Sequence, residues 1–171
     1  MIAAMAREEV ELAQAYRTVP TGLFLFTTVA DGHPNVQFAF RALGIQDDPP
    51  YVLVGVQNRN YSLYAIRETR EFGLNVCSEA QVPAIDASRG LSGREVPDKI
   101  ARLGLETFAA RHIKAPLIAG CHANVECRVV DSMEGPGVTL FMAEALAVYL
   151  DRERPPVLRL AGKTYFMGGP A

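Results

Sequence analysis

GCHANVECRVVDSMEGPGVTLFMAEALAVYLD, residues 120–151, has the pattern of two long strands joined by a tight turn. In its first half, apolar or small residues from Ala123 to Val129 alternate with Asn124, Glu126 and Arg128. A period of two is typical of a half-buried strand. Residues 135–137, Gly-Pro-Gly, provide the turn.

Further strand-like runs occur at residues 22–29, 35–40, 49–57 and 71–78. The Asp-Gly-His-Pro sequence at 31–34 predicts a turn that makes the first two runs a hairpin. Strands spread along the whole chain predict a mainly β fold, an antiparallel barrel with short accessory helices, because closure removes exposed sheet edges.

Helical patterns are short and lie between the strands. Residues 58–69 predict a helix with Asn60 or Ser62 as its cap, and residues 97–104 predict another within an irregular excursion at 81–115. A leading helix is expected within residues 1–18 and the barrel within 20–166. Without repeats or linkers, we expect a single domain over residues 1–171.

Composition limits the classes of partner. The chain has 171 residues, of which 49% are apolar, and its net charge of -2 is spread without blocks of like charge. Neither nucleic acid nor an anionic membrane is therefore an expected partner, and the longest apolar runs are too short to span a bilayer. Three cysteines without a secretory signal predict a cytoplasmic protein.

Common catalytic and metal-binding motifs are absent, so no metal is expected and no catalytic residue is identified. Two segments have the chemistry of an anion site. One follows a strand and begins a helix with Asn58, Arg59, Asn60 and Ser62. These residues could hold a phosphate at the helix start, or Asn60 or Ser62 could merely cap the helix while Arg59 is solvated.

The second segment, SGREVPDK at residues 92–99, raises the same choice. Arg94 and Lys99 could close over an anion from the excursion, or could be ordinary surface charges. Composition favours neither alternative.

Five motifs in this order resemble the flavin reductase-like, FMN-binding split-barrel family. They are PTGLFLFTT with the following DG and PNV, DDPPYVLVGVQNRNYSLYAIRETREFGLNV, SGREVPDKIARLGL, APLIAGCHANVECRVV and PPVLRLAGKTYF, from about Pro20 to Phe166. The resemblance implies a homodimer with FMN in a groove at or near the subunit interface. It also implies hydride transfer from NADH or NADPH to flavin, with an oxygenase or electron-transfer protein as a possible further partner.

The resemblance also assigns candidate site residues. It makes Asn58, Arg59, Asn60 and Ser62 phosphate contacts and places Arg94 and Lys99 near the flavin.

The sequence departs from the family at the strand beside the flavin ring. A threonine and a serine of the family fall on Phe38 and Phe40, and a histidine common in the family falls on Val138. The backbone of residues 37–40 (Gln37, Phe38, Ala39 and Phe40) could still pair with the ring edge, or Phe38 and Phe40 could fill the groove.

Three functions follow from these observations. The first is an NAD(P)H:flavin oxidoreductase, and the second is an FMN-binding electron carrier or sensor without nicotinamide turnover, which the missing hydroxyls and histidine favour. The third is a dimeric barrel that binds no flavin, against which the Asn- and Ser-containing phosphate turn argues. The oxidoreductase is the leading hypothesis. Residues 22–29 are apolar on both faces, which predicts that a partner subunit buries one of them.

Overall fold

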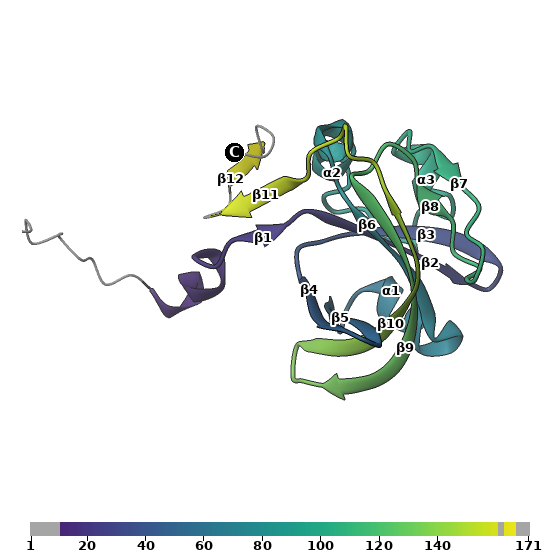
Figure 1. Cartoon of the computed structure of the whole chain (residues 1–171), viewed down its shortest axis with the longest axis horizontal. Coiled ribbons are helices and arrows are strands. Elements are labelled where there is room, and N and C mark those ends of the chain that lie inside the picture. Colours follow the sequence, from purple (N-terminus) through teal and green to yellow (C-terminus); the bar gives the residue numbers. More distant parts are fainter. Residues whose placement is uncertain (1–10, 161–162, 167–171) are drawn as a thin grey trace, which may run out of the picture.

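A seven-stranded antiparallel sheet curves around the core, with strand order β3-β2-β6-β9-β10-β5-β4 (Figure 1). The computed structural model describes residues 11–160 and 163–166. The strands are β2 (Phe24–Ala30), β3 (His33–Ala39), β4 (Ala42–Asp47), β5 (Pro50–Gln57), β6 (Glu71–Val76), β9 (Ala123–Glu134) and β10 (Val138–Leu150). The predicted antiparallel barrel is confirmed, and β3 and β4 form the two ends of its sheet.

The long hairpin of β9 and β10 is as predicted. Its register runs from Thr139 opposite Glu134 to Leu150 opposite Ala123, with shifts at Met142/Ala143 and Ala145/Ala147. Such irregularities bend a strand and increase its twist, which suits a sheet that curves around a core.

The barrel interior is filled by aromatic and aliphatic side chains. Phe26, Phe72 and Phe141 are each at most 1% exposed and belong to one cluster. Helix α1 (Tyr61–Thr69) adds Leu63 and Ile66 to this core, so its N-terminus is held in a fixed place against the sheet.

The excursion covers the outer face of β2 and β3. Within it lie α2 (Val82–Ala87), α3 (Lys99–Arg102) and β7 (Thr107–Phe108), and it is flanked by η2 (Glu79–Gln81) and β8 (Leu117–Ile118). Ile85 and Ile100 pack there in a second cluster with Leu23 and Leu25. The prediction that a partner subunit buries the second apolar face of residues 22–29 is therefore wrong, because the chain's own excursion covers it.

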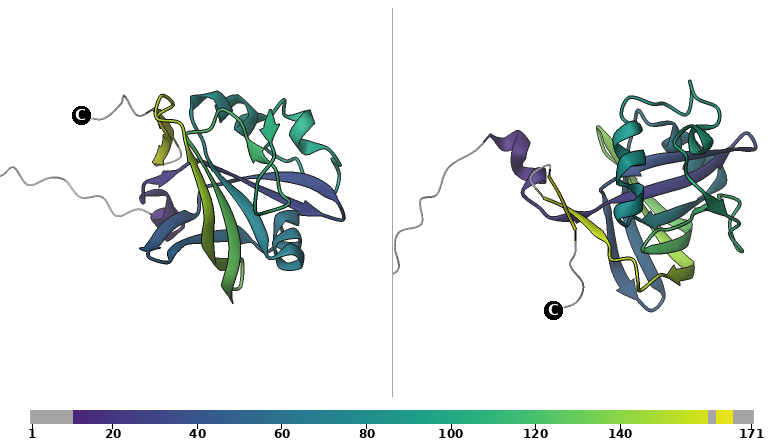
Figure 2. Two further views of the ribbon diagram at one scale, coloured as in Figure 1. Left: turned by 45° about the vertical axis from the view of Figure 1, so that its right-hand side comes forward. Right: turned by 90° about the horizontal axis from the view of Figure 1, so that it is seen from above.

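A separate three-stranded sheet projects from the barrel. It is formed by β1 (Thr21–Gly22), β11 (Val157–Leu160) and β12 (Lys163–Phe166). With the 3₁₀ helix η1 (Leu12–Arg17) these strands form what we call the arm, which extends to one side of the barrel (Figure 2). The predicted leading helix is thus a short 3₁₀ helix within the described residues, and its first part, residues 1–10, lies outside them.

Several boundaries differ from the prediction. The β2–β3 turn consists of Asp31 and Gly32 alone, with φ values of 51° and 77°, as a two-residue hairpin turn requires. His33 and Pro34 already belong to β3, and α3 is shorter than the helix predicted over residues 97–104. No helix in the described part of the chain is long and apolar enough to cross a membrane.

Candidate functional site

A cavity of about 450 Å³ lies between β3, the start of α1 and the loop at residues 88–93. Because β3 is an end strand, one of its edges presents backbone N–H and C=O groups that pair with no strand. The lining residues are Asn35, Val36, Gln37, Phe38, Gln57, Arg59, Asn60, Tyr61, Ser62, Ser88, Arg89, Gly90, Leu91, Ser92, Gly93 and Lys99.

The start of α1 faces this cavity without a side-chain cap. Asn60 occupies the N-cap position, but its side chain makes no capping hydrogen bond. Ser62 is 1% exposed and accepts a hydrogen bond from Asn35 Nδ2 at 3.0 Å. The Asn60 carbonyl accepts from the Leu63 N–H at 3.1 Å, but neither the Asn60 nor the Ser62 side chain caps the helix. The other N–H groups of this first turn carry partial positive charge and suit an anion.

Lys99 is a buried cation at the cavity wall. Lys99 is only 6% exposed as a whole residue. Within residues 11–160 and 163–166, no ion pair links its ammonium to a carboxylate. Burial lowers the pKa of Lys99 from its ordinary value. This desolvation disfavours the charged ammonium, and no carboxylate offsets it, so an anionic ligand would stabilise the charge.

Two arginines add positive charge at the rim. Arg59 Nε donates to Gln57 Oε1 at 3.1 Å, and Arg89 forms an exposed ion pair with Asp86 at 3.2 Å. The cavity therefore has cationic groups from both the α1 turn and the loop.

Two buried oxygen atoms of the cavity residues have no hydrogen-bond partner in the part of the chain that the structure describes. They are Asn35 Oδ1 and Gln37 Oε1. Asn35 Oδ1 faces Gly93 of the loop, so Gln37 Oε1 is the acceptor that remains for a ligand. A ligand that carries O–H or N–H donors as well as an anionic group therefore fits the chemistry of this cavity better than a bare anion.

The structure brings six of the predicted site residues together. Those that line the cavity are Gln37, Phe38, Arg59, Asn60, Ser62 and Lys99. Sequence reasoning missed Asn35, Tyr61 and residues 88–91 of the loop, whereas Ser92 and Gly93 begin the segment 92–99 named above. Only Ser88 and Gly90 could have indicated a close backbone approach there.

The other four predicted residues do not line the cavity. Ala39 is buried in the barrel core, and Arg94 is exposed, with its backbone N–H bonded to Ser92 Oγ. Asn58 instead holds the neighbouring turn, because its Nδ2 donates to Gly135 O at 2.9 Å and its Oδ1 accepts from Thr139 at 2.8 Å.

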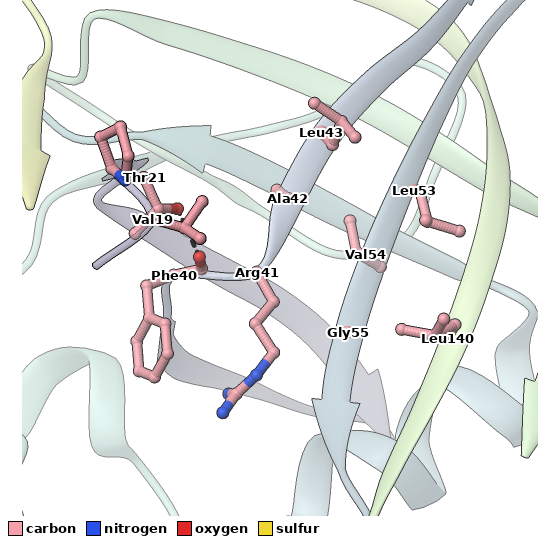
Figure 3. A pocket seen from close by; sticks show the side chains of 11 residues that line it. Val19, Thr21, Phe40, Arg41, Ala42, Leu43, Leu53, Val54, Gly55 and Leu140 are labelled. Carbon is pink, nitrogen blue, oxygen red and sulfur yellow. Dashed lines mark hydrogen bonds between the residues drawn. The ribbon is translucent and has the colours of Figure 1, made fainter. Parts of the chain in front are cut away.

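Phe40, the fourth of these residues, lines a different pocket. This apolar hollow of about 370 Å³ lies between β4, β5 and the start of β1 (Figure 3). Arg41 lies over the Phe40 ring, 4.4 Å from its centroid, and the Phe38 and Phe40 centroids are 6.0 Å apart. The two phenylalanines therefore contact each other between two pockets, and they do not fill the polar cavity together.

Val138 lies on β10 directly opposite Gln57, a lining residue. An apolar side chain thus stands beside the cavity where the resembled family commonly has a histidine. Within the described residues, no group of three or more His, Cys, Asp or Glu side chains could hold a metal ion.

The three cysteines are buried and unpaired. Burial raises the pKa of Cys77 and of Cys127, so these thiols are not nucleophiles at neutral pH.

Comparison with known proteins gives a family match over most of the chain. The family described as "Flavin reductase like domain" matches residues 16–168. The reductase component of a 4-nitrophenol 4-monooxygenase/4-nitrocatechol 2-monooxygenase from Rhodococcus opacus is 29% identical over 130 residues, or 74% of this chain and 64% of that protein. The chain spans only 38% to 64% of the lengths of three curated relatives that it matches.

Solved structures share the fold. The NADH:FAD oxidoreductase SgcE6 of Streptomyces globisporus C-1027 superposes with a TM-score of 0.86 at 21% identity, covering 95% of this chain and 99% of that one. Another structure of that protein is in complex with NAD and FAD fragments. The flavoredoxin of Desulfovibrio vulgaris (Miyazaki F) has a TM-score of 0.80 at 26% identity, covering 96% of both chains.

Proposed function

Since the chain belongs to the flavin reductase-like domain family, we propose that it binds FMN in the polar cavity and is an NAD(P)H:flavin oxidoreductase. When bound, FMN would supply the redox chemistry by accepting hydride from a reduced nicotinamide. The residues of this chain bind and orient the reactants, so the lack of a paired general acid and base is no objection.

The residues present fit this cofactor. The uncapped start of α1, Ser62 and the buried Lys99 would hold the phosphate, while Gln37 Oε1 offers an acceptor to a hydroxyl or N–H group. The cavity volume of about 450 Å³ is within the usual range of small-molecule sites, roughly 300–1,000 Å³. The single observation that carries the proposal is the buried, unpaired Lys99 beside an uncapped helix start.

The test is the visible spectrum of the protein after incubation with FMN and removal of free ligand. Retained flavin bands that NADH or NADPH bleaches without oxygen would support the reductase. Lys99→Met should retain less FMN, whereas Lys114→Met, which removes an exposed ammonium, should match the wild type. No retention of flavin by the wild type at any tested concentration would overturn the proposal.

An electron carrier or sensor without nicotinamide turnover is the second candidate function. Two departures favour it, namely Phe38 at the cavity wall and Val138 opposite Gln57, where the resembled family has polar groups. The similarity to a flavoredoxin is consistent with it. Flavin bands that persist in the presence of both nicotinamides would favour this second function.

We also propose that the chain forms a homodimer through β4 and the arm. On β4, Leu43 is 63% exposed and Ile45 is 44% exposed, beside the apolar pocket of Phe40 and Arg41. Apolar patches of this kind commonly mark interfaces. An oxygenase or electron-transfer protein is proposed as the partner that receives electrons from the reduced flavin, because a relative is the reductase component of a monooxygenase.

A cytoplasmic location is likewise proposed, supported by three free cysteines and no disulfide among them. Fractionation of cells that express the chain would test it, and recovery in an oxidising compartment would contradict it.

A further inference from the structure

Asn35 and Ser62 form a buried hydrogen bond between β3 and α1. Asn35 Nδ2 donates to Ser62 Oγ at 3.0 Å, and the two residues are 5% and 1% exposed. A serine hydroxyl has a single hydrogen to donate. Because Ser62 Oγ accepts from Asn35, that hydrogen remains for another acceptor, and none within hydrogen-bond distance occurs in the described part of the chain.

We propose that Asn35 is a positioning residue that makes Ser62 a donor to the phosphate, so that this cavity prefers phosphorylated flavin to riboflavin. The inference rests on the proposed function and assigns a role to a residue outside the predicted phosphate turn. Its physical basis is that an amide N–H directed at Ser62 Oγ orients the hydroxyl hydrogen away from Asn35, whereas an unbonded hydroxyl would rotate freely.

Three segments hold the Asn35 amide in place. Asn35 lies opposite Thr28 in the β2–β3 register, and its Nδ2 is bound to α1. On the other side is Gly93 of the loop at 88–93, so close that a Cβ at Gly93 would overlap Asn35 Oδ1. Lys99 lines the same cavity, so a phosphate there would meet an oriented hydroxyl and a cation together.

A purely structural role for the hydrogen bond makes a different prediction. If Asn35 only joins β3 to α1, its loss should weaken every flavin equally. If Asn35 acts through Ser62 on the phosphate, its loss should weaken FMN alone, because riboflavin has the same ring and ribityl chain without the phosphate.

The experiment measures the dissociation constants of FMN and riboflavin by fluorescence titration. Ser62→Ala should weaken FMN roughly tenfold or more, as expected for a hydrogen bond to a charged group. Asn35→Leu should weaken FMN about three- to tenfold because orientation alone is lost. Both variants should leave riboflavin unchanged within about twofold, and the double variant should bind FMN no more weakly than Ser62→Ala.

Thr28→Val is the matched control. Thr28 lies opposite Asn35 on the neighbouring strand, and its buried hydroxyl has no hydrogen-bond partner among the described residues. The affinity for both ligands should therefore stay as in the wild type. If Asn35→Leu does not fold, the FMN and riboflavin dissociation constants are compared in Asn35→Ala, which has a smaller side chain.

Equal weakening of FMN and riboflavin by Asn35→Leu would overturn the inference while leaving the proposed function intact. So would a double variant in which the two losses simply multiply. A wild-type protein that binds neither flavin would overturn the proposed function as well as the inference.

Discussion

Glu126 is a fully buried carboxylate on β9 whose hydrogen bonds attach the excursion to the barrel. Its oxygens accept from the backbone N–H of Arg111 at 2.8 Å and of His112 at 2.6 Å, and from Tyr149 Oη at 2.7 Å. Burial alone would raise the pKa of Glu126, but these donors outweigh it and lower the pKa below the ordinary value. The side chain is therefore a charged anchor in the folded state.

The lowered pKa sets the direction of the acid response. The unfolded state takes up a proton near the ordinary glutamate pKa, about 4.3, and the folded state only below it. Stabilisation by Glu126 is therefore complete above that pH and is lost as the pH falls through the folded-state pKa. Acid should loosen the attachment of the excursion before it disrupts the barrel.

Glu126→Gln should reduce the free energy of unfolding at neutral pH by about 1–3 kcal/mol, because an amide cannot accept all three hydrogen bonds. The stability of the variant should also fall less than that of the wild type between about pH 6 and pH 3. Urea unfolding across this range measures both effects.

Glu134→Gln on the same strand is the control. The Glu134 carboxylate only pairs with Arg67 at the surface, at 2.9 Å, so the change should stay within about 0.5 kcal/mol. Equal losses for the two variants would contradict the role assigned to Glu126.

At the scale of elements, the contact of the loop at 88–93 with β3 and α1 depends on the absence of a side chain at Gly93. A Cβ there would overlap Asn35 Oδ1 and lie 2.8 Å from Tyr61 Cδ1. Gly93→Ala should therefore lower stability by about 1–3 kcal/mol and weaken FMN binding, since the loop and Asn35 both belong to the cavity wall.

Gly137→Ala is the matched change for Gly93→Ala. A Cβ at Gly137 would meet no atom within 4 Å, so this substitution should be neutral or slightly stabilising. Thermal unfolding and FMN titration compare the two variants. A Gly93→Ala protein as stable as Gly137→Ala would show that the loop does not pack tightly on β3.

The elements that were predicted are those whose pattern repeats over several residues. The β9–β10 hairpin has long alternation and a Gly-Pro-Gly turn, and α1 has a helix-start signal and an apolar face. In contrast, β4 was not predicted because all but the first of its residues are exposed, so no buried face marks it. Helix α2 was not predicted because its six residues are too few for a helical period to repeat. Helix α3 was predicted within residues 97–104 from Pro97 and Gly104, but it has only four residues.

The alternating pattern also did not predict that residues on the outer face of β9 are buried. Asn124 and Glu126 alternate with the core residues as surface positions do, yet they are 6% and 0% exposed. The excursion covers them, and its path depends on tertiary packing that strand periodicity does not record.

The candidate site was partly predictable for a similar reason. Asn60 and Ser62 stand at a helix start, which is a local signal. For Lys99 the residues left an anion site and a surface charge equally open, and only the family resemblance placed it near the flavin. Asn35 reaches Ser62 across 27 residues of sequence, and nothing in its own strand indicates that contact. Asn58 has the right composition for a phosphate turn, but its amide is used by Gly135 and Thr139.

At the scale of the whole molecule, one apolar surface lies at the β4 end of the sheet, where Leu43 and Ile45 are exposed beside an apolar pocket. Strand β4 is an end strand, and the apolar pocket beside it reaches from Val19 and Pro20 near the arm to Leu140 on β10 (Figure 3). Unpaired strand edges next to exposed apolar side chains favour association. Because the excursion covers β2, this face rather than β2 is the expected subunit interface.

Leu43→Glu should convert the proposed dimer to a monomer, because a dimer would then bury a carboxylate without a counter-charge, which is costly. Sedimentation velocity at several concentrations measures the change, with the wild type sedimenting as a dimer. Val148→Glu is the matched control, since Val148 is 62% exposed, close to the 63% of Leu43, but lies on β10 opposite Val125. A monomeric wild type, or dimers that persist equally in both variants, would place the interface elsewhere or remove it.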